Sequence, residues 1–171
     1  MSCVEHTETS LEAQDWITED TIVYGRAKIN SHSGKGIQVF TIDDRFNPDL
    51  PLYTKGIMKA HEYRVHVAFG NVIDVTKKRK RDGATTGDYI RNIDNGWVYC
   101  REDIIIPYLI VIESLKAIEA LGLHFGAVDV LYRERENKAW VLEVNTAPGL
   151  EGTTLNKYVE AFNEFVTNNE R

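Results

Sequence analysis

Three oxygen-bearing side chains in the last third of the chain, Asp129, Glu143 and Asn145, have the types and the spacing of a metal site. They lie in two apolar segments that are predicted to be β-strands, joined by the charged turn 133–138. If the turn centres near Glu136, Asp129 lies opposite Glu143, and strand alternation places Glu143 and Asn145 on one face. Opposed carboxylates repel each other, which costs stability unless a divalent cation such as Mg²⁺ lies between them. The alternative is a half-solvated hairpin whose acidic side chains face water.

A glycine-containing loop at residues 30–36 is a candidate phosphate site. Gly34 and Gly36 would let backbone N–H groups approach phosphate oxygens closely. The loop joins two predicted strands, whereas a Walker A motif or a dinucleotide fingerprint requires a strand followed by a helix. Arg26 and Lys28 precede the loop and add positive charge beside it. A flexible hairpin tip without a ligand is the alternative.

A second hairpin is predicted around a two-residue turn at residues 70–71. Strand alternation places Glu62, Arg64 and His66 on one face. The predicted register pairs Arg64 with Lys77, and two opposed cations favour an anion bound between them.

The basic run 77–81 at the end of this hairpin allows three interpretations. It is typical of nucleic-acid binding or nuclear import, and also of a solvated edge strand protected by lysines. We favour a third, in which every second residue points toward a triphosphate and neutralises it. Arg91, in a later polar turn, is either a clamp for a carboxylate or phosphate or an ordinary surface arginine.

The composition is that of a globular protein with a real core, since 43% of the 171 residues are hydrophobic and 27% are charged. The net charge of -6 argues against a large basic surface for nucleic acid. Cys3 and Cys100 lack the spacing of a metal knuckle or a disulfide framework, which fits a reducing cytosol. No apolar run reaches membrane-spanning length, and no signal peptide opens the chain.

Hydrophobic periodicity predicts mainly strands in the first half and two amphipathic helices, at 107–121 and 155–166. Because strands and helices do not alternate strictly, the predicted fold class is α+β with antiparallel sheets. Thr153 or Thr154 is predicted to cap the last helix, whose N-terminal N–H groups would then face an anion.

Two of these segments resemble ATP-grasp ligases. Residues 141–152 (VLEVNTAPGLEG) resemble the metal-binding strand and loop of ribosomal-protein glutamate ligases and D-alanine–D-alanine ligases. Residues 62–67 (EYRVHV) resemble the strand after the adenine hinge, and the whole pattern is similar to ATP-grasp proteins of tailed phages. The resemblance implies two α+β lobes that hold ATP between them, a smaller lobe at 1–57 and a larger one at 58–171.

The resemblance also implies roles for individual residues. Asp129, Glu143 and Asn145 would bind Mg²⁺, with Mn²⁺ as a second choice of ion. Arg26 stands where the family has a phosphate-binding lysine, and Lys28 competes for that role. The other implied contacts are Ser33, Gly34, Lys35 and Gly36 over the phosphates, Thr54, Lys55 and Ile57 at adenine, Glu62 at ribose, Gly149 near the developing oxyanion, and Arg64, Lys77 and Arg91 at the phosphate and acyl substrate.

The implied function is an ATP- and Mg²⁺-dependent carboxylate–amine ligase that works through an acyl phosphate. Its substrates would be small-molecule or peptide carboxylates and amines, in the cytoplasm, or in the host cytoplasm if a phage encodes the protein. Family members usually carry a further N-terminal domain of about a hundred residues. The chain is expected to lack that domain, so the alternative is a nucleotide-binding module or split-protein fragment that needs a partner chain. Nucleic-acid binding through 77–81 is the third hypothesis.

Overall fold

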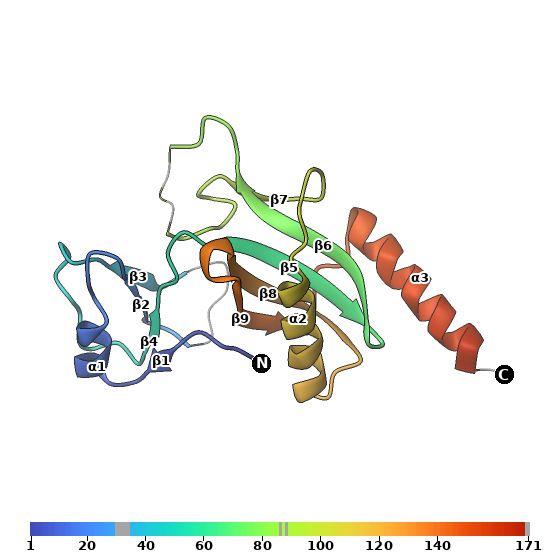
Figure 1. The fold of residues 1–171 in the computed structure, drawn as a ribbon, viewed down its shortest axis with the longest axis horizontal. Coiled ribbons are helices and arrows are strands. Elements are labelled where there is room, and N and C mark those ends of the chain that lie inside the picture. Colours follow the sequence, from blue (N-terminus) through green and yellow to red (C-terminus); the bar gives the residue numbers. More distant parts are fainter. Residues whose placement is uncertain (30–34, 86, 88, 170–171) are drawn as a thin grey trace. The chain divides into compact units, whose positions relative to one another are not determined.

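Segments with alternating apolar side chains pair into two antiparallel sheets, which confirms the predicted α+β class (Figure 1). The computed structural model describes residues 1–29, 35–85, 87 and 89–169. Two units can be distinguished, one comprising Met1–Cys3, Ala60–Lys78 and Tyr99–Arg171, the other Val4–Lys59 and Arg79–Val98. The predicted lobes, 1–57 and 58–171, place residues 1–3, 58–59 and 79–98 in a different part from these two units. The division into these lobes stays a prediction.

A five-stranded sheet, most of which belongs to the larger unit, has the strand order β7-β6-β5-β8-β9. Its strands are β5 (His61–Ala68), β6 (Asn71–Lys80), β7 (Trp97–Cys100), β8 (Phe125–Arg133) and β9 (Lys138–Asn145). The helix α2 (Tyr108–Ala120) packs against β5, β8 and β9, and the short 3-10 turn η1 (Glu134–Glu136) joins β8 to β9. The helix α3 (Gly152–Asn169) follows β9.

One face of this sheet is apolar because every second residue of its central strands is apolar. Tyr63, Val65 and Val67 of β5 are buried in a cluster with Ile110 and Ile118 of α2. Burial of one such side chain contributes roughly 1.5–3 kcal/mol. The opposite face of the sheet carries polar side chains, and the candidate site lies there.

The smaller unit has a four-stranded sheet with the order β1-β4-β2-β3. Its elements are β1 (His6–Thr7), α1 (Ser10–Asp15), β2 (Val23–Arg26), β3 (Ile37–Phe40) and β4 (Leu52–Lys55). Ala13 of α1 is buried against Val23, Phe40, Leu50 and Tyr53, which form the core of this unit.

Both predicted amphipathic helices are confirmed, as α2 and α3. The last helix begins at Gly152, three residues before the predicted start, so the prediction that Thr153 or Thr154 caps it was wrong. Both threonines lie in its first turn. In the part of the chain that the structure describes, no helix is long and apolar enough to cross a membrane.

Candidate active site

A row of polar side chains crosses the face of the five-stranded sheet opposite α2. Arg64 of β5 pairs with Thr76 of β6 on one side and with Asp129 of β8 on the other. Asp129 in turn pairs with Glu143 of β9. Residues paired across strands share a face, so four adjacent strands contribute one side chain each to the row.

The predicted opposition of Asp129 and Glu143 is confirmed, and it depends on a β-bulge. Val130 pairs with Val141, and a regular strand would continue with Asp129 opposite Leu142. The register shifts by one residue at this point, so Leu142 is the extra residue and Glu143 lies opposite Asp129. The bulge also lets Val141 stay in the core while Glu143 lies on the polar face, although residues two apart in a regular strand share a face.

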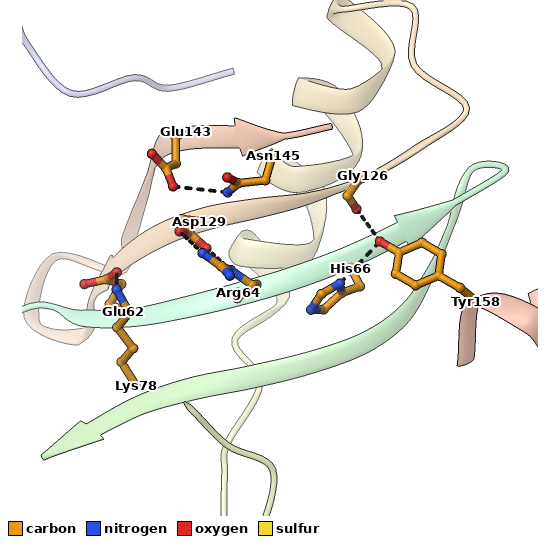
Figure 2. Close-up of polar contacts among 9 residues, drawn as sticks. All are labelled: Glu62, Arg64, His66, Lys78, Gly126, Asp129, Glu143, Asn145 and Tyr158. Atoms are coloured by element: carbon orange, nitrogen blue, oxygen red, sulfur yellow. Dashed lines mark hydrogen bonds and ion pairs between the residues drawn. The ribbon is translucent and has the colours of Figure 1, made fainter. Parts of the chain in front are cut away.

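Asp129 is held by two hydrogen bonds from one guanidinium group (Figure 2). Nε and Nη2 of Arg64 donate to the two carboxylate oxygens of Asp129, each at 2.7 Å. The side chain of Asp129 is 5% exposed, so its charge would be strongly destabilising without this partner. The ring of Tyr99 packs against the guanidinium, with Cζ of Arg64 at 4.7 Å from the ring centroid.

These neighbours also decide the protonation of Arg64 and Tyr99. Burial acts to lower the pKa of Arg64, but the hydrogen bonds and charge of Asp129, with smaller effects of Tyr99 and Glu143, outweigh it and raise the pKa. Burial, followed by the charge of Asp129, raises the pKa of the Tyr99 hydroxyl, which therefore stays protonated.

The donor set predicted for a metal ion fits a hard cation chemically. Glu143 is exposed, and the Asn145 amide donates to its Oε1 at 3.1 Å. The oxygens of Asp129 keep further lone pairs beyond the bonds from Arg64. Two carboxylates and one amide oxygen suit Mg²⁺, which completes its coordination with water and substrate phosphates. The described residues contain no group of three or more histidine, cysteine or acidic side chains placed to hold a metal without such help.

The predicted register between β5 and β6 was wrong. The turn falls at residues 69–70, both of which have a left-handed φ, and Ile73 is the extra residue of a β-bulge. Lys77 therefore pairs with Tyr63 instead of Arg64. Its Nζ lies 5.5 Å from the Tyr63 ring centroid, on the apolar side of the sheet, so Lys77 does not share a face with Arg64.

Lys78 is the residue of the basic run 77–81 that lies beside Arg64. It forms an ion pair with Glu62, the predicted ribose contact, on the polar face (Figure 2). Its Nζ also lies 5.3 Å from the Tyr99 ring centroid. The prediction that part of the run points toward the site therefore applies to Lys78.

A cavity of about 450 Å³ lies next to Arg64 on the same face. His66 and Thr76 line it, together with Tyr99 and Arg101 and residues from the loop after β9, including Gly149. Cavities of roughly 300–1,000 Å³ are typical of sites for small molecules. The cavity lies entirely within the larger unit.

Arg101 fixes the first turn of α3 beside this cavity. Its Nη2 donates to Oδ2 of Asp74 at 2.7 Å and to the Thr154 hydroxyl at 2.8 Å. The side chain of Asp74 is only 8% exposed. Asp74 and the buried Thr154 thus connect β6 to the start of α3 through one guanidinium group.

His66 is connected to the middle of the same helix. Its Nδ1 lies 3.3 Å from the Tyr158 hydroxyl, which donates to the Gly126 carbonyl at 3.0 Å (Figure 2). Burial raises the pKa of Tyr158. Burial also lowers the pKa of His66, and the charges around it have mixed effects, since Asp74 and Asp129 favour protonation and Arg64 and Arg101 oppose it.

In the smaller unit, the predicted nucleotide contacts on the strands lie on two faces. Arg26 and Thr54 share one face of the sheet, opposite the core residues of β2 and β4. Lys55 lies on the other face, where it forms an ion pair with Glu5 at 3.1 Å and approaches the ring of Trp16. The strand pairing thus groups Arg26 with Thr54 but not with Lys55.

The other predicted residues of the smaller unit that the structure describes lie outside its regular strands. Gly36 has a φ of 76°, and its carbonyl accepts a hydrogen bond from the Ala27 amide. The Arg91 guanidinium stacks on Trp97, with Cζ at 5.0 Å from the ring centroid. Lys28 and Lys35 are exposed and Ile57 is half-buried, whereas Ser33 and Gly34 are outside the described residues. The roles assigned to all of them stay predictions.

Sequence reasoning missed five residues that border the site. Asp74 and Thr76 alternate with apolar neighbours in β6, a signal that would have placed them on the polar face. Tyr158 lies among the apolar residues of the predicted helix 155–166, a pattern that signals packing and not a contact with the site. Tyr99 and Arg101 carry no local signal, because only the pairing of β7 with β6 brings them to this face.

The Arg64–Asp129 pair makes a stability prediction. We expect Arg64→Met to lower the free energy of unfolding by about 3–5 kcal/mol, because it leaves Asp129 buried and unpaired. Denaturant unfolding measures the change. Lys157→Met, which removes the exposed partner of Glu160, is the control and should cost less than about 1 kcal/mol. Equal effects of the two substitutions would contradict the assignment of Asp129 as a buried ion.

The lowered pKa of His66 makes a prediction about pH. In the unfolded chain His66 binds a proton at its ordinary pKa of 6.5, whereas in the folded chain it does so only at lower pH. The contribution of neutral His66 to stability is therefore complete above pH 6.5. It is lost as the pH falls through the folded-state pKa. We expect the free energy of unfolding of His66→Asn to depend less on pH below 6.5 than that of the unaltered protein. Parallel pH profiles from denaturant unfolding would show that His66 does not resist protonation.

Comparison with known proteins bears on the fold. No protein-family model and no curated protein matches the sequence. Among solved structures, the chain is similar to D-alanine–D-alanine ligase from Bacillus anthracis, at 17% identity and a TM-score of 0.64 over 94% of this chain and 62% of that one. It is also similar to the ATP-grasp ligase PsnB, complexed with minimal precursor, Mg and ADP, at 15% identity, a TM-score of 0.61 and 90% and 48% coverage.

A third similar structure is the macrocyclase MdnC from Microcystis aeruginosa MRC, bound with precursor peptide MdnA. It is 16% identical, with a TM-score of 0.62 over 98% of this chain and 56% of that one. The chain thus spans between about half and two thirds of the length of these three proteins. At such identities the likeness concerns architecture, and the chain has the ATP-grasp fold.

Proposed function

We propose that this protein is an ATP- and Mg²⁺-dependent carboxylate–amine ligase. ATP would phosphorylate a substrate carboxylate, and an amine would then displace phosphate from the acyl phosphate to form an amide. The observation that carries the proposal is the row of Arg64, Asp129 and Glu143 beside a cavity of small-molecule size, on a sheet of the ATP-grasp fold. Phosphoryl transfer depends on positioning and charge neutralisation and requires no protein nucleophile.

In this proposal the polar face provides both the metal ligands and the anion contacts. Asp129, Glu143 and Asn145 would hold Mg²⁺, which when bound would neutralise the charge of substrate phosphates. Arg64 uses two of its five N–H donors on Asp129, and the others remain for a phosphate or carboxylate oxygen. Glu62 would accept from the ribose hydroxyl groups.

The substrate class is suggested by the proteins of similar fold. One is named as a ligase of the amino acid D-alanine, and two are described with precursor or precursor peptide. We therefore propose small-molecule or peptide carboxylates and amines. The alternative is a nucleotide-binding module that needs a partner chain for catalysis.

The decisive experiment measures ADP release. The full chain is mixed with ATP and Mg²⁺. The common amino acids and short peptides are then added in pairs, with one compound as the carboxylate substrate and the other as the amine substrate. We expect ADP release that depends on the acid, and calorimetric binding of Mg·ATP. Binding without turnover under every pairing would favour the nucleotide-binding module, and absence of binding would contradict both functions.

Glu143→Gln tests the metal site within the proposed function. We expect it to weaken Mg·ATP binding at least as much as loss of an outer-shell partner does, roughly 10–100-fold. The metal-free protein should keep its fold and gain up to about 1 kcal/mol of stability, because the repulsion from Asp129 is relieved.

Glu136→Gln is the matched control for this substitution. Glu136 lies in the turn between β8 and β9 and pairs with Arg133. Its substitution should leave Mg·ATP binding unchanged. If Glu143→Gln binds Mg·ATP as before, or unfolds, the opposed carboxylates are not a metal site.

A further inference from the structure

Two polar groups in the cavity beside Arg64 have no part in phosphoryl transfer as proposed. Thr76 is 3% exposed, and its hydroxyl has no hydrogen-bond partner among the described residues. His66 is 4% exposed and lines the same cavity. A buried polar group without a hydrogen-bond partner is destabilising, so the Thr76 hydroxyl points to a polar ligand in this cavity.

The hydrogen bonds around Tyr158 fix the tautomer of His66. A carbonyl oxygen can only accept, so the single hydroxyl proton of Tyr158 is donated to Gly126. The Tyr158 oxygen is then the acceptor for Nδ1 of His66, which must carry a proton. In a neutral ring Nε2 is therefore unprotonated, and it makes no hydrogen bond to any described residue.

We infer that the cavity binds the attacking amine and that Nε2 of His66 accepts the proton which this amine loses, a role that rests on the proposed ligase function. The hydrogen bond from Nδ1 to Tyr158 holds the ring in place, and the free lone pair of Nε2 can accept a proton from a ligand in the cavity. The Thr76 hydroxyl provides a second polar contact for the amine. Because its pKa is lowered, the ring is neutral at pH 7 and competent as a base.

The chemical step balances with these groups. The nitrogen lone pair of the neutral amine forms the N–C bond to the acyl carbon. The C–O bond to phosphate breaks, and phosphate leaves with the electron pair of that bond. One proton of the attacking nitrogen passes to Nε2 of His66 and then to the departing phosphate or to water, which restores the neutral ring. Asp74 and Asp129 favour the transient imidazolium, while Arg64 and Arg101 oppose it and so promote its deprotonation.

NMR of the full chain labelled with ¹⁵N-histidine tests the ring without any substrate. At pH 7 we expect His66 to have a protonated Nδ1 and an unprotonated Nε2. Tyr158→Phe removes the acceptor for Nδ1 and should increase the fraction with Nε2 protonated. A ring in the unaltered protein that is charged, or that carries its proton on Nε2, would overturn the inference.

A comparison of two nucleophiles tests the proton transfer itself. Glycinamide and hydroxylamine are supplied with an acid that supports ADP release. Hydroxylamine is uncharged near neutral pH and strongly nucleophilic, so it depends little on a base. In His66→Asn, whose amide can still donate to Tyr158, we expect amide formation with glycinamide to fall roughly 10²–10⁴-fold. Hydroxamate formation should fall far less.

His61→Asn, an exposed position on the same strand, is the control and should leave both products unchanged. Equal losses of amide and hydroxamate in His66→Asn would overturn the role of His66 as a base. The proposed function fails separately, if no acid supports ADP release in the unaltered protein. The NMR result concerns the ring of His66 alone, so the two failures are distinguishable.

Discussion

The ion pair between Arg64 and Asp129 is the interaction on which the polar face of the larger unit depends. Asp129 is nearly inaccessible and lies directly opposite a second carboxylate, Glu143. Without a cation at this point, burial and repulsion would both oppose the folded sheet. The guanidinium meets both oxygens of Asp129 and is itself packed on Tyr99, so charge balance and geometry are provided by rigid strands. Elements on regular secondary structure hold such groups more accurately than loops do.

Two β-bulges make this face possible. Each inserts one extra residue, Leu142 in β9 and Ile73 in β6, next to the point where the site begins. Between each turn and its bulge, the register of the strand pair is set by the turn. Beyond the bulge the register is shifted by one residue. Acidic or polar positions therefore meet on one face, while apolar positions stay against α2. Each bulge interrupts the hydrogen-bond ladder locally, whereas the shift in register extends along the rest of the strand.

Charged side chains and the His66 ring lie close together on the polar face. Arg64 and Asp129 are ions that compensate each other, and Arg101 and Asp74 form a second compensated pair. His66 lies on the same strand as Arg64. Burial lowers its pKa, and the four charges around it act in opposite directions. In the reaction that we propose, the paired ions would contact the phosphate and the His66 ring would accept the proton of the amine.

The sequence by itself determined the α+β class and both amphipathic helices, which follow from periodicity, a local property. The ATP-grasp fold was implied by the resemblance of residues 62–67 and 141–152 to that family. The opposition of Asp129 and Glu143 was expected from the position of the turn and is reached through a bulge. The register of β5 with β6 was decided by the tertiary structure, because an unexpected turn and a bulge shift it and place Lys78 rather than Lys77 beside Arg64. The contact of Tyr158 with His66 and the hydrogen bonds from Arg101 to Asp74 and Thr154 join segments far apart in the chain. Such contacts depend on tertiary packing, which no local sequence pattern predicts.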